Sequence, residues 1–367
     1  MNIVVTGAQG FIGRNLMVRL QESGLEAVPI GSDADEAAWR DKLGRADLVV
    51  HLAGVNRPVD EADFVAGNVG TTEGLVRLLK EIGRTIPVIY ASSIQAERDN
   101  AYGLSKRMAE DVLFRYAQES GAPVRVFRLA NVFGKWAKPN YNSAVATFCH
   151  NIARGLPVAV NDASAPLRLV HVDDVCEAML ELIRQPPSGA AFAEAEPVYQ
   201  TTVGAVADAI SGYAASRETL VTARVGQGLD RALYSTYLSY LEPENFAYEA
   251  PQHADPRGVF VEMLKTPDCG QFSYFTAGPG ITRGEHYHHT KTEKFLVLTG
   301  KAHFGFRHIL TGQRHEVVTE GGQARIVETI PGWTHNITNI GDSDMVVMLW
   351  ANEIFDRARP DTIAQKV

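Results

Sequence analysis

A run of glycines directly behind an apolar segment at the start of the chain most limits how this sequence can fold. Residues 3–5 are apolar, Gly7, Gly10 and Gly13 follow at intervals of three, and apolar residues then recur at helical spacing. This order predicts a strand, a tight turn and a helix. The first glycine permits the turn, the second lets a pyrophosphate approach the backbone, and the third lets the helix pack close to the strand. The pattern therefore predicts dinucleotide binding at the helix N-terminus.

The composition is that of a folded globular chain and argues against several classes of protein. With 367 residues, of which 45% are hydrophobic and 21% charged, the chain is long enough for two domains. A net charge of −8 argues against nucleic acid as the main partner. No apolar run approaches the ~20 residues that a membrane span requires. Because there is no recognisable secretory signal and the three cysteines are far apart, we expect a cytoplasmic protein.

Hydroxyl, phenol and ammonium groups follow one another in an order that suits proton transfer. Residues 88–93 form a predicted strand that ends in Ser92 and Ser93, at the edge where a parallel sheet binds its ligands. Tyr102 and Lys106 are four residues apart on a predicted helix and share one face. A nearby ammonium lowers the pKa of a phenol, so we expect Tyr102 to exchange a proton with a substrate oxygen near neutral pH. Each motif alone is more often a loop or a solvated helix face.

Taken together, these motifs resemble the extended short-chain dehydrogenases/reductases. The matching stretches are TGAQGFIG at 6–13, HLAG at 51–54, YASS at 90–93, YGLSK at 102–106, RLANVFG at 128–134 and HVDDV at 171–175. The resemblance implies a Rossmann-fold α/β domain in which Ser93, Tyr102 and Lys106 serve hydride transfer between a nicotinamide and a sugar carbon, with Ser92 as the alternative hydroxyl. The expected cofactor contacts are Gly7, Gly10, Phe11, Ile12, Gly13, Arg14, Leu52, Ala53, Gly54, Tyr102 and Lys106.

The choice between the two nicotinamide cofactors depends on the end of the second predicted strand. NAD-specific enzymes usually place an acid there to bind the ribose hydroxyls. This chain has Gly31 and Ser32 at that point, and Asp33 comes later. Arg14, directly after the third glycine, is placed to face a 2′-phosphate, although a solvated helix position explains it equally well. The sequence therefore favours NADPH.

A loop over residues 135–142 interrupts the fold with aromatic, cationic and amide groups. This mixture suits a nucleotide-sugar, and a polar surface loop is the alternative. We expect Lys135 and Asn140 of this loop to contact the substrate. The resemblance adds Arg168, which precedes the HVDDV stretch, since this region helps hold the diphosphate in related enzymes.

The character of the sequence changes after Tyr240, where the alternation of strand-like and helix-like segments stops. Eight of the eleven histidines lie between positions 253 and 335, among short glycine-punctuated strands. This pattern predicts a separate all-β domain. We expect an N-terminal domain over residues 1–245 and a C-terminal domain over 246–367.

Four residues of the second region form a metal-ligand pattern. His286 and His288 are two apart on a predicted strand and share a face. Glu293 and His335 complete a set of three imidazoles and one carboxylate, which suits Zn²⁺ or a similar divalent ion. The spacing G-x5-H-x-H-x4-E-x6-G over residues 280–300 resembles the cupins, which are small β-barrels with an internal metal.

A second resemblance concerns the metal-independent dTDP-4-keto-sugar 3,5-epimerases, whose barrels are cupin-like. It rests on DPRGVFVE at 255–262 and RGEHY at 283–287. It implies that His286 is the base that removes a proton beside a ketone, and that Arg257 and Glu262 hold the nucleotide. His288 and Glu293 are additions that favour a metal. The general base of the barrel stays open at this point.

Over almost its full length the chain resembles bacterial capsule and O-antigen enzymes of the CapF type. The shared stretches are GVNRP at 54–58, GKWAKPNYNS at 134–143, LYSTYLSYL at 233–241 and HHTKTEKFLV at 288–297. The resemblance implies a homodimer that acts on a UDP-2-acetamido-2,6-dideoxy-4-keto-hexose. The cupin domain would invert C3, and the N-terminal domain would reduce the C4 ketone with NADPH to UDP-2-acetamido-2,6-dideoxy-L-talose. Two alternatives stay open: an NAD-dependent nucleotide-sugar 4-epimerase with a dimerising cupin, and a non-catalytic sugar or redox sensor.

Overall fold

The structure is a computed structural model of the whole chain. It describes residues 1–367 except 32, 187, 251, 256–257, 262–263, 265, 267–269 and 354–357. The chain divides into two compact units. Unit 1 comprises Met1–Phe133, Tyr141–Ser143 and Leu167–Gln200, and unit 2 comprises Gly134–Asn140, Ala144–Pro166 and Thr201–Val367. This division groups part of the region before residue 245 with the C-terminal strands, and the predicted boundary at 245/246 stays a prediction.

Unit 1 is built on a six-stranded sheet in which all neighbouring strands are parallel. The order is β2-β1-β3-β4-β5-β8. The direction of winding reverses between β1 and β3, and such sheets bind their ligands at the carboxyl ends of the strands at this point. The strands are β1 (Asn2–Thr6), β2 (Glu26–Ile30), β3 (Leu48–His51), β4 (Val88–Ser93), β5 (Val124–Leu129) and β8 (Ala190–Ala193).

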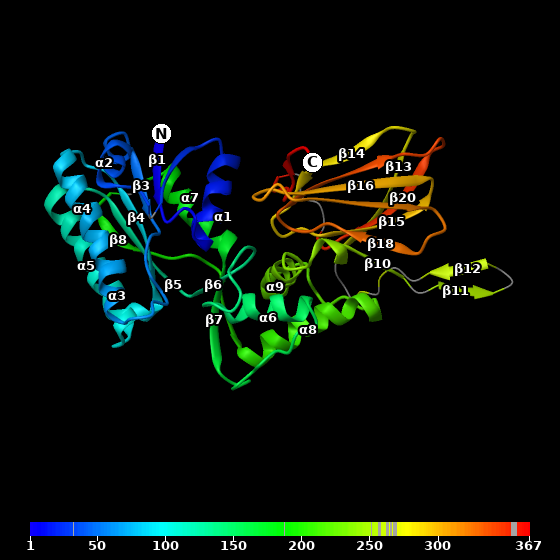
Figure 1. Cartoon of the computed structure of the whole chain (residues 1–367), viewed down its shortest axis with the longest axis horizontal. Coiled ribbons are helices and arrows are strands. Elements are labelled where there is room, and N and C mark those ends of the chain that lie inside the picture. Colours follow the sequence, from blue (N-terminus) through cyan, green and yellow to red (C-terminus); the bar gives the residue numbers. More distant parts are fainter. Residues whose placement is uncertain are drawn as a thin grey trace. The chain divides into compact units, whose positions relative to one another are not determined.

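Helices cover both faces of this sheet (Figure 1). On one face, α2 (Glu36–Gly44), α4 (Thr71–Ile82) and α5 (Ala101–Ser120) enclose one apolar core cluster. On the other face, α1 (Phe11–Glu22) and α7 (Val172–Arg184) enclose a second cluster. Strands with apolar residues on both faces need this cover, and the predicted Rossmann-type domain is confirmed. The short elements are α3 (Ala62–Phe64), η1 (Val65–Gly70), η2 (Ile94–Glu97), and a small sheet of β6 (Asn131–Phe133), β7 (Pro166–His171) and β9 (Val198–Thr202).

Unit 2 contains two five-stranded antiparallel sheets, with the orders β10-β18-β15-β20-β13 and β17-β16-β19-β14-β21. The rings of Phe295 on β15 and Phe304 on β16 lie 5.7 Å apart between centroids, so the two sheets pack face to face. This arrangement confirms the predicted all-β region. The strands are β10 (Ala247–Glu249), β13 (Gln271–Ala277), β14 (Thr282–Tyr287), β15 (Glu293–Thr299), β16 (Lys301–His308), β17 (Arg314–Glu320), β18 (Arg325–Glu328), β19 (Trp333–Asn339), β20 (Met345–Ala351) and β21 (Ile363–Ala364), with a separate antiparallel pair of β11 (Gln252–Asp255) and β12 (Gly258–Val261).

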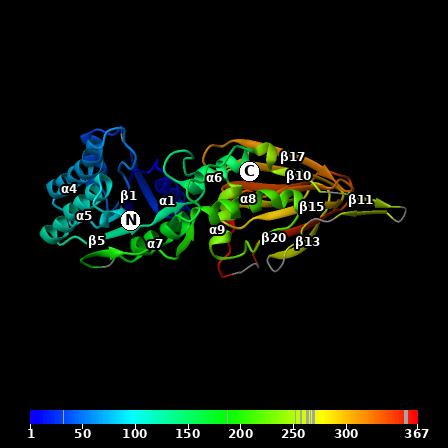
Figure 2. The same ribbon diagram turned by 90° about the horizontal axis from the view of Figure 1, so that it is seen from below.

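Three helices of unit 2 pack on one another, namely α6 (Ala144–Ala153), α8 (Val203–Thr219) and α9 (Gly228–Leu238) (Figure 2). A buried ion pair ties them to the strands: Glu328 accepts from Arg217 of α8 at 3.1 Å and from Lys294 of β15 at 2.6 Å. This contact explains why these helices group with the C-terminal strands. The short η3 (Pro243–Asn245) follows α9.

None of the helices that the structure describes has the length and apolar character required to cross a membrane.

Candidate active site and metal centre

The glycine turn lies where the sheet reverses its winding, between β1 and β3. The Gly10 amide donates to the Gly7 carbonyl at 2.9 Å, and α1 begins directly afterwards. Gly7 has φ +67°, and a Cβ there would lie 2.7 Å from the Ala53 nitrogen. A Cβ at Gly13 would lie 2.2 Å from the Gly7 oxygen, so α1 approaches the turn too closely for any other residue. This geometry agrees with the predicted roles of the first and third glycines, and cofactor contact itself stays a prediction.

The other predicted cofactor contacts surround this turn. Phe11 and Ile12 are half-buried in the first turn of α1, and Arg14 is exposed. Leu52 and Ala53 are half-buried after β3, and the Leu52 amide donates to the Thr6 carbonyl at 3.2 Å. The ends of the two strands are thus held side by side.

Ser93, Tyr102 and Lys106 come from two neighbouring elements. Ser93 ends β4, and the other two lie in the first two turns of α5. The Asn100 side chain caps α5 by accepting from the Gly103 amide at 2.7 Å. Ser93 favours the ionised form of the Tyr102 phenol and so opposes the effect of burial on its pKa. The strand end and the helix start therefore bring two of the three predicted catalytic groups close to each other.

The structure distinguishes Ser93 from its neighbour Ser92. The Ser92 hydroxyl is buried and donates to the Glu110 carboxylate at 2.5 Å. The same carboxylate accepts from Arg128 at 2.7 Å. Because Ser92 is occupied by this buried pair, Ser93 is the hydroxyl that is available beside Tyr102.

The environment of Lys106 differs from the expectation. Its ammonium donates to the Ala91 carbonyl at 2.8 Å and lies 4.4 Å from the centre of the Tyr90 ring. Burial lowers the pKa of Lys106 to about 7, opposed by the Glu110 carboxylate. Burial also raises the pKa of Tyr102. The predicted lowering of the Tyr102 pKa is therefore wrong in this structure, since burial outweighs the opposing effect of Ser93 and leaves the phenol protonated at neutral pH.

Asn68 is a positioning residue that the sequence analysis missed. It lies on the single π-helical turn η1, a feature that often marks functional sites. Its side chain accepts from the Val55 amide at 3.0 Å and donates to the Ser105 hydroxyl at 2.9 Å. A Cβ at Gly54 would lie 2.6 Å from its oxygen and 3.8 Å from the Lys106 nitrogen. Asn68 therefore fixes the loop after β3 beside Lys106. No short-range sequence pattern marks a π-turn, so spacing along the chain gave no signal for Asn68.

The predicted substrate residues are placed in three different settings. Lys135 is only 2% exposed, and like the exposed Asn140 it belongs to unit 2. Arg168 is exposed on β7 in unit 1. Arg257 and Glu262 lie outside the described residues. Contact of these five residues with a substrate stays a prediction.

The four predicted metal ligands converge in unit 2. His286 on β14 is paired directly opposite His335 on β19, His288 follows β14, and Glu293 begins β15. One ligand atom from each lies within 4.8 Å of all the others. The Nε2 atoms of His288 and His335 lie 3.3 and 3.6 Å from the same Glu293 oxygen. The strand pairing thus creates a cluster that sequence spacing had predicted.

The chemistry of this cluster fits a divalent ion. His335 is 5% exposed, and neither of its ring nitrogens has a hydrogen-bond partner. Burial lowers the pKa of His335 and lowers that of His286 to about 3, so both rings are neutral. Although burial opposes ionisation, the hydrogen bond with His288 keeps the pKa of Glu293 well below its ordinary value. Neutral imidazoles and a carboxylate are the ligand forms that Zn²⁺ and similar ions require.

Fold and sites together define an oxidoreductase-type Rossmann protein whose all-β region carries a candidate metal cluster. The comparisons with known proteins agree with this fold class. Residues 3–194 match the NAD dependent epimerase/dehydratase family, and the chain belongs to this family. Residues 253–363 match the polysaccharide biosynthesis C-terminal domain.

Particular relatives narrow this class further. The chain is 55% identical to the UDP-2-acetamido-2,6-beta-L-arabino-hexul-4-ose reductase of Pseudomonas aeruginosa, over 100% of this chain and 99% of that one. It is 41% identical to the capsular polysaccharide assembling protein CapF from Staphylococcus aureus, covers 100% of both chains, and superposes with a TM-score of 0.69. By contrast, UDP-glucuronic acid decarboxylase 6 of Arabidopsis thaliana is 23% identical over 52% of this chain and 68% of that protein. The predicted resemblance to the CapF type is confirmed.

Proposed function

We propose that the chain is a bifunctional nucleotide-sugar enzyme of capsule or O-antigen synthesis. The observation that carries this proposal is the grouping of Ser93 and Tyr102 with Lys106, which lies near Gly54 in the loop that packs against the glycine turn. The substrate class follows from the reductase of Pseudomonas aeruginosa. The proposed substrate is a UDP-2-acetamido-2,6-dideoxy-4-keto-hexose. Unit 2 inverts its C3 and unit 1 reduces its C4 ketone, which yields UDP-2-acetamido-2,6-dideoxy-L-talose.

In the reduction, the protein's own groups manage the proton. A nicotinamide cofactor supplies a hydride when bound. Tyr102 keeps its proton at neutral pH because burial raises the pKa of its phenol, and it donates this proton to the ketone oxygen. Ser93, close to Tyr102, would orient the same oxygen with its hydroxyl. Lys106 holds a fixed position through Ala91, and it would donate to a ribose hydroxyl of the cofactor.

In the epimerisation, His286, His288, Glu293 and His335 would hold the metal. A bound divalent ion supplies a Lewis acid that stabilises negative charge on the ketone oxygen. Such charge develops when the C3 proton is removed, and return of the proton on the other face inverts the carbon. The ring of His286 lies 4.7 Å from that of His335 and 4.9 Å from that of His288, measured between centroids. This crowding favours a role for His286 as a ligand over a role as the base.

The whole proposal is tested by supplying the protein with the keto-sugar and NADPH. We expect one equivalent of NADPH to be oxidised for each sugar, and NMR should show a product with C3 inverted and C4 reduced. A sugar 4-epimer formed without net cofactor oxidation would instead identify an NAD-dependent 4-epimerase, because that enzyme regenerates its cofactor. Saturable binding of both ligands without any turnover would identify a sensor.

NADPH is the proposed cofactor, and two side chains provide the test. Asp33 is the feature that favours NADH. Its carboxylate lies 2.4 Å from the point where a Cβ on Gly31 would be, so it reaches the end of β2, where NAD-specific enzymes place an acid. Arg14 favours a 2′-phosphate. We expect titrations to give tighter binding of NADPH than of NADH, and Arg14→Ala to remove this preference. A preference for NADH that Asp33→Asn removes would overturn the assignment.

A cytoplasmic homodimer belongs to the same proposal. It rests on the resemblance to CapF-type enzymes and on the low cysteine content. Cys149 and Cys176 are buried as thiols, as expected in a reducing compartment.

A further inference from the structure

The segment after residue 360 lies along the strand that carries His286. The short strand β21 pairs antiparallel with β14, and Ala364 lies opposite His286. Farther along, the Gln365 amide donates to the Glu285 carbonyl at 2.8 Å. The Thr334 hydroxyl, next to His335, donates to the Gln365 carbonyl at 2.5 Å. The segment 361–367 is therefore fixed against two of the strands that carry the metal ligands.

At the start of this segment, the backbone of Asp361 contacts a metal ligand directly. The Nδ1 atom of His288 lies 2.5 Å from the Asp361 carbonyl oxygen. Because a carbonyl only accepts, this contact places the ring proton on Nδ1. The other nitrogen, Nε2, lies 3.3 Å from the Glu293 carboxylate and is the atom left to bind an ion. A histidine ligand needs such a partner to set its tautomer and its ring orientation.

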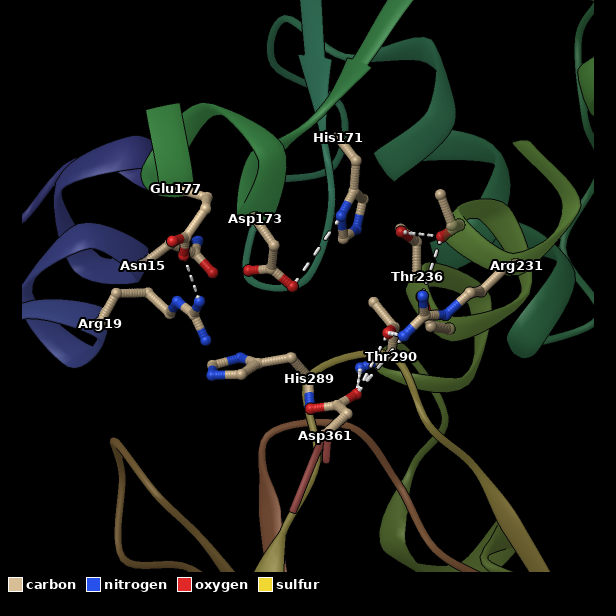
Figure 3. A network of polar contacts seen from close by, with 12 residues as sticks. Asn15, Arg19, His171, Asp173, Glu177, Arg231, Thr236, His289, Thr290 and Asp361 are labelled. Carbon is tan, nitrogen blue, oxygen red and sulfur yellow. Dashed lines mark hydrogen bonds and ion pairs between the residues drawn. The ribbon is translucent and has the colours of Figure 1, made fainter. Parts of the chain in front are cut away.

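The side chain of Asp361 holds the turn that separates His288 from Glu293. One carboxylate oxygen accepts from the His289 amide at 2.8 Å. The other accepts from the amides of Thr290 and Lys291 at 2.6 and 2.7 Å, and from the Thr290 hydroxyl at 3.1 Å (Figure 3). Four donors on one carboxylate fix the backbone of three consecutive residues, so the two ligands on either side of the turn are held in register.

Arg231 extends this arrangement to helix α9. Its guanidinium, drawn in Figure 3, donates to the Thr290 hydroxyl. It lies 3.9 Å from the Asp361 carboxylate. It also pairs with Glu353 at 3.0 Å. The charge of Asp361 is thus balanced within unit 2.

We propose that Asp361 is a positioning residue of the metal centre, which sets the tautomer of His288 with its carbonyl and the spacing of His288 and Glu293 with its carboxylate. This inference rests on the proposed metal site. Partners of metal ligands typically change metal affinity by roughly 10- to 100-fold when they are altered.

The test measures Zn²⁺ affinity of the full chain by competition with a chromophoric chelator. We expect Asp361→Ala to weaken the affinity by about 10- to 100-fold. Asp361→Asn should lie between Asp361→Ala and the wild type, because it retains one acceptor oxygen for the turn. Asp342→Asn, at an exposed position of the same β region, is the matched control and should bind like the wild type. The absorption spectrum of bound Co²⁺ should change in Asp361→Ala, since the ligand geometry changes with the turn.

Thermal unfolding of the metal-free proteins separates positioning from general stability. A lower midpoint for metal-free Asp361→Ala, together with unchanged Zn²⁺ affinity and an unchanged Co²⁺ spectrum, would make the residue merely structural and overturn the inference. If the wild-type chain itself takes up neither ion, the proposed metal site fails and this inference fails with it. The two failures are distinguishable because only the second involves the wild type.

Discussion

Replacing Tyr102 by phenylalanine should nearly abolish ketone reduction and leave cofactor binding intact. The substitution removes only the phenol O–H, which lies near Ser93. The ring itself is retained, together with its contact with Phe64, whose centroid lies 5.5 Å away. General acid catalysis contributes typically 10²–10⁴-fold, so we expect kcat to fall by at least about 100-fold.

Cofactor binding is measured by titrating the variant with NADPH. Turnover is measured as the loss of NADPH absorbance in the presence of the keto-sugar. Tyr116→Phe is the matched control on the same helix, because its hydroxyl donates to the Ile86 carbonyl at 3.1 Å in the buried core. It should lose a little stability and keep its turnover. Lys106→Ala should also lower turnover strongly, since Lys106 is buried beside the site. Retention of more than about a tenth of the wild-type turnover by Tyr102→Phe would remove Tyr102 from proton transfer.

Features carried by short spacing were predictable from the sequence. The glycine turn, the pair Tyr102 and Lys106, and the ligands His286 and His288 all lie within a few residues of one another, where strand and helix periodicity fixes their relative position. Spacing places groups on one face but does not report how deeply they are buried. For this reason the direction of the Tyr102 pKa shift was predicted wrongly.

Features that depend on distant segments were not predictable from spacing. The assignment of Ser93 over Ser92 depends on Glu110, which is 18 residues away in the sequence. The tautomer of His288 depends on Asp361, 73 residues away. The docking of α8 depends on the buried contact between Arg217 and Glu328. Each of these is a tertiary contact of a charged or polar group, and its partner becomes apparent only when the strands are paired.

The second large effect concerns the metal centre, where His288→Ala should separate the two proposed reactions. The substitution removes one of four converging ligands and leaves the glycine turn and Tyr102 of unit 1 unchanged. Loss of a bound ion would withdraw a Lewis acid that could stabilise negative charge on the ketone oxygen by several kcal/mol. We therefore expect exchange of the C3 hydrogen with D₂O, measured without NADPH, to fall by about 100-fold or more. NADPH should still bind, and the unepimerised ketone should be reduced slowly.

A matched histidine of the same β region serves as the control for His288→Ala. His303 on β16 is half-buried, is not one of the four proposed ligands, and pairs with Glu316 at 3.3 Å. His303→Ala should therefore retain both the bound ion and the hydrogen exchange. Metal content of each variant is measured alongside the exchange rate. Exchange at the wild-type rate in a His288→Ala protein that lacks metal would exclude the metal-dependent route. If His286→Ala then stopped the exchange while His288→Ala did not, His286 would be the base. Two residues that act only as metal ligands should lose the exchange in both variants.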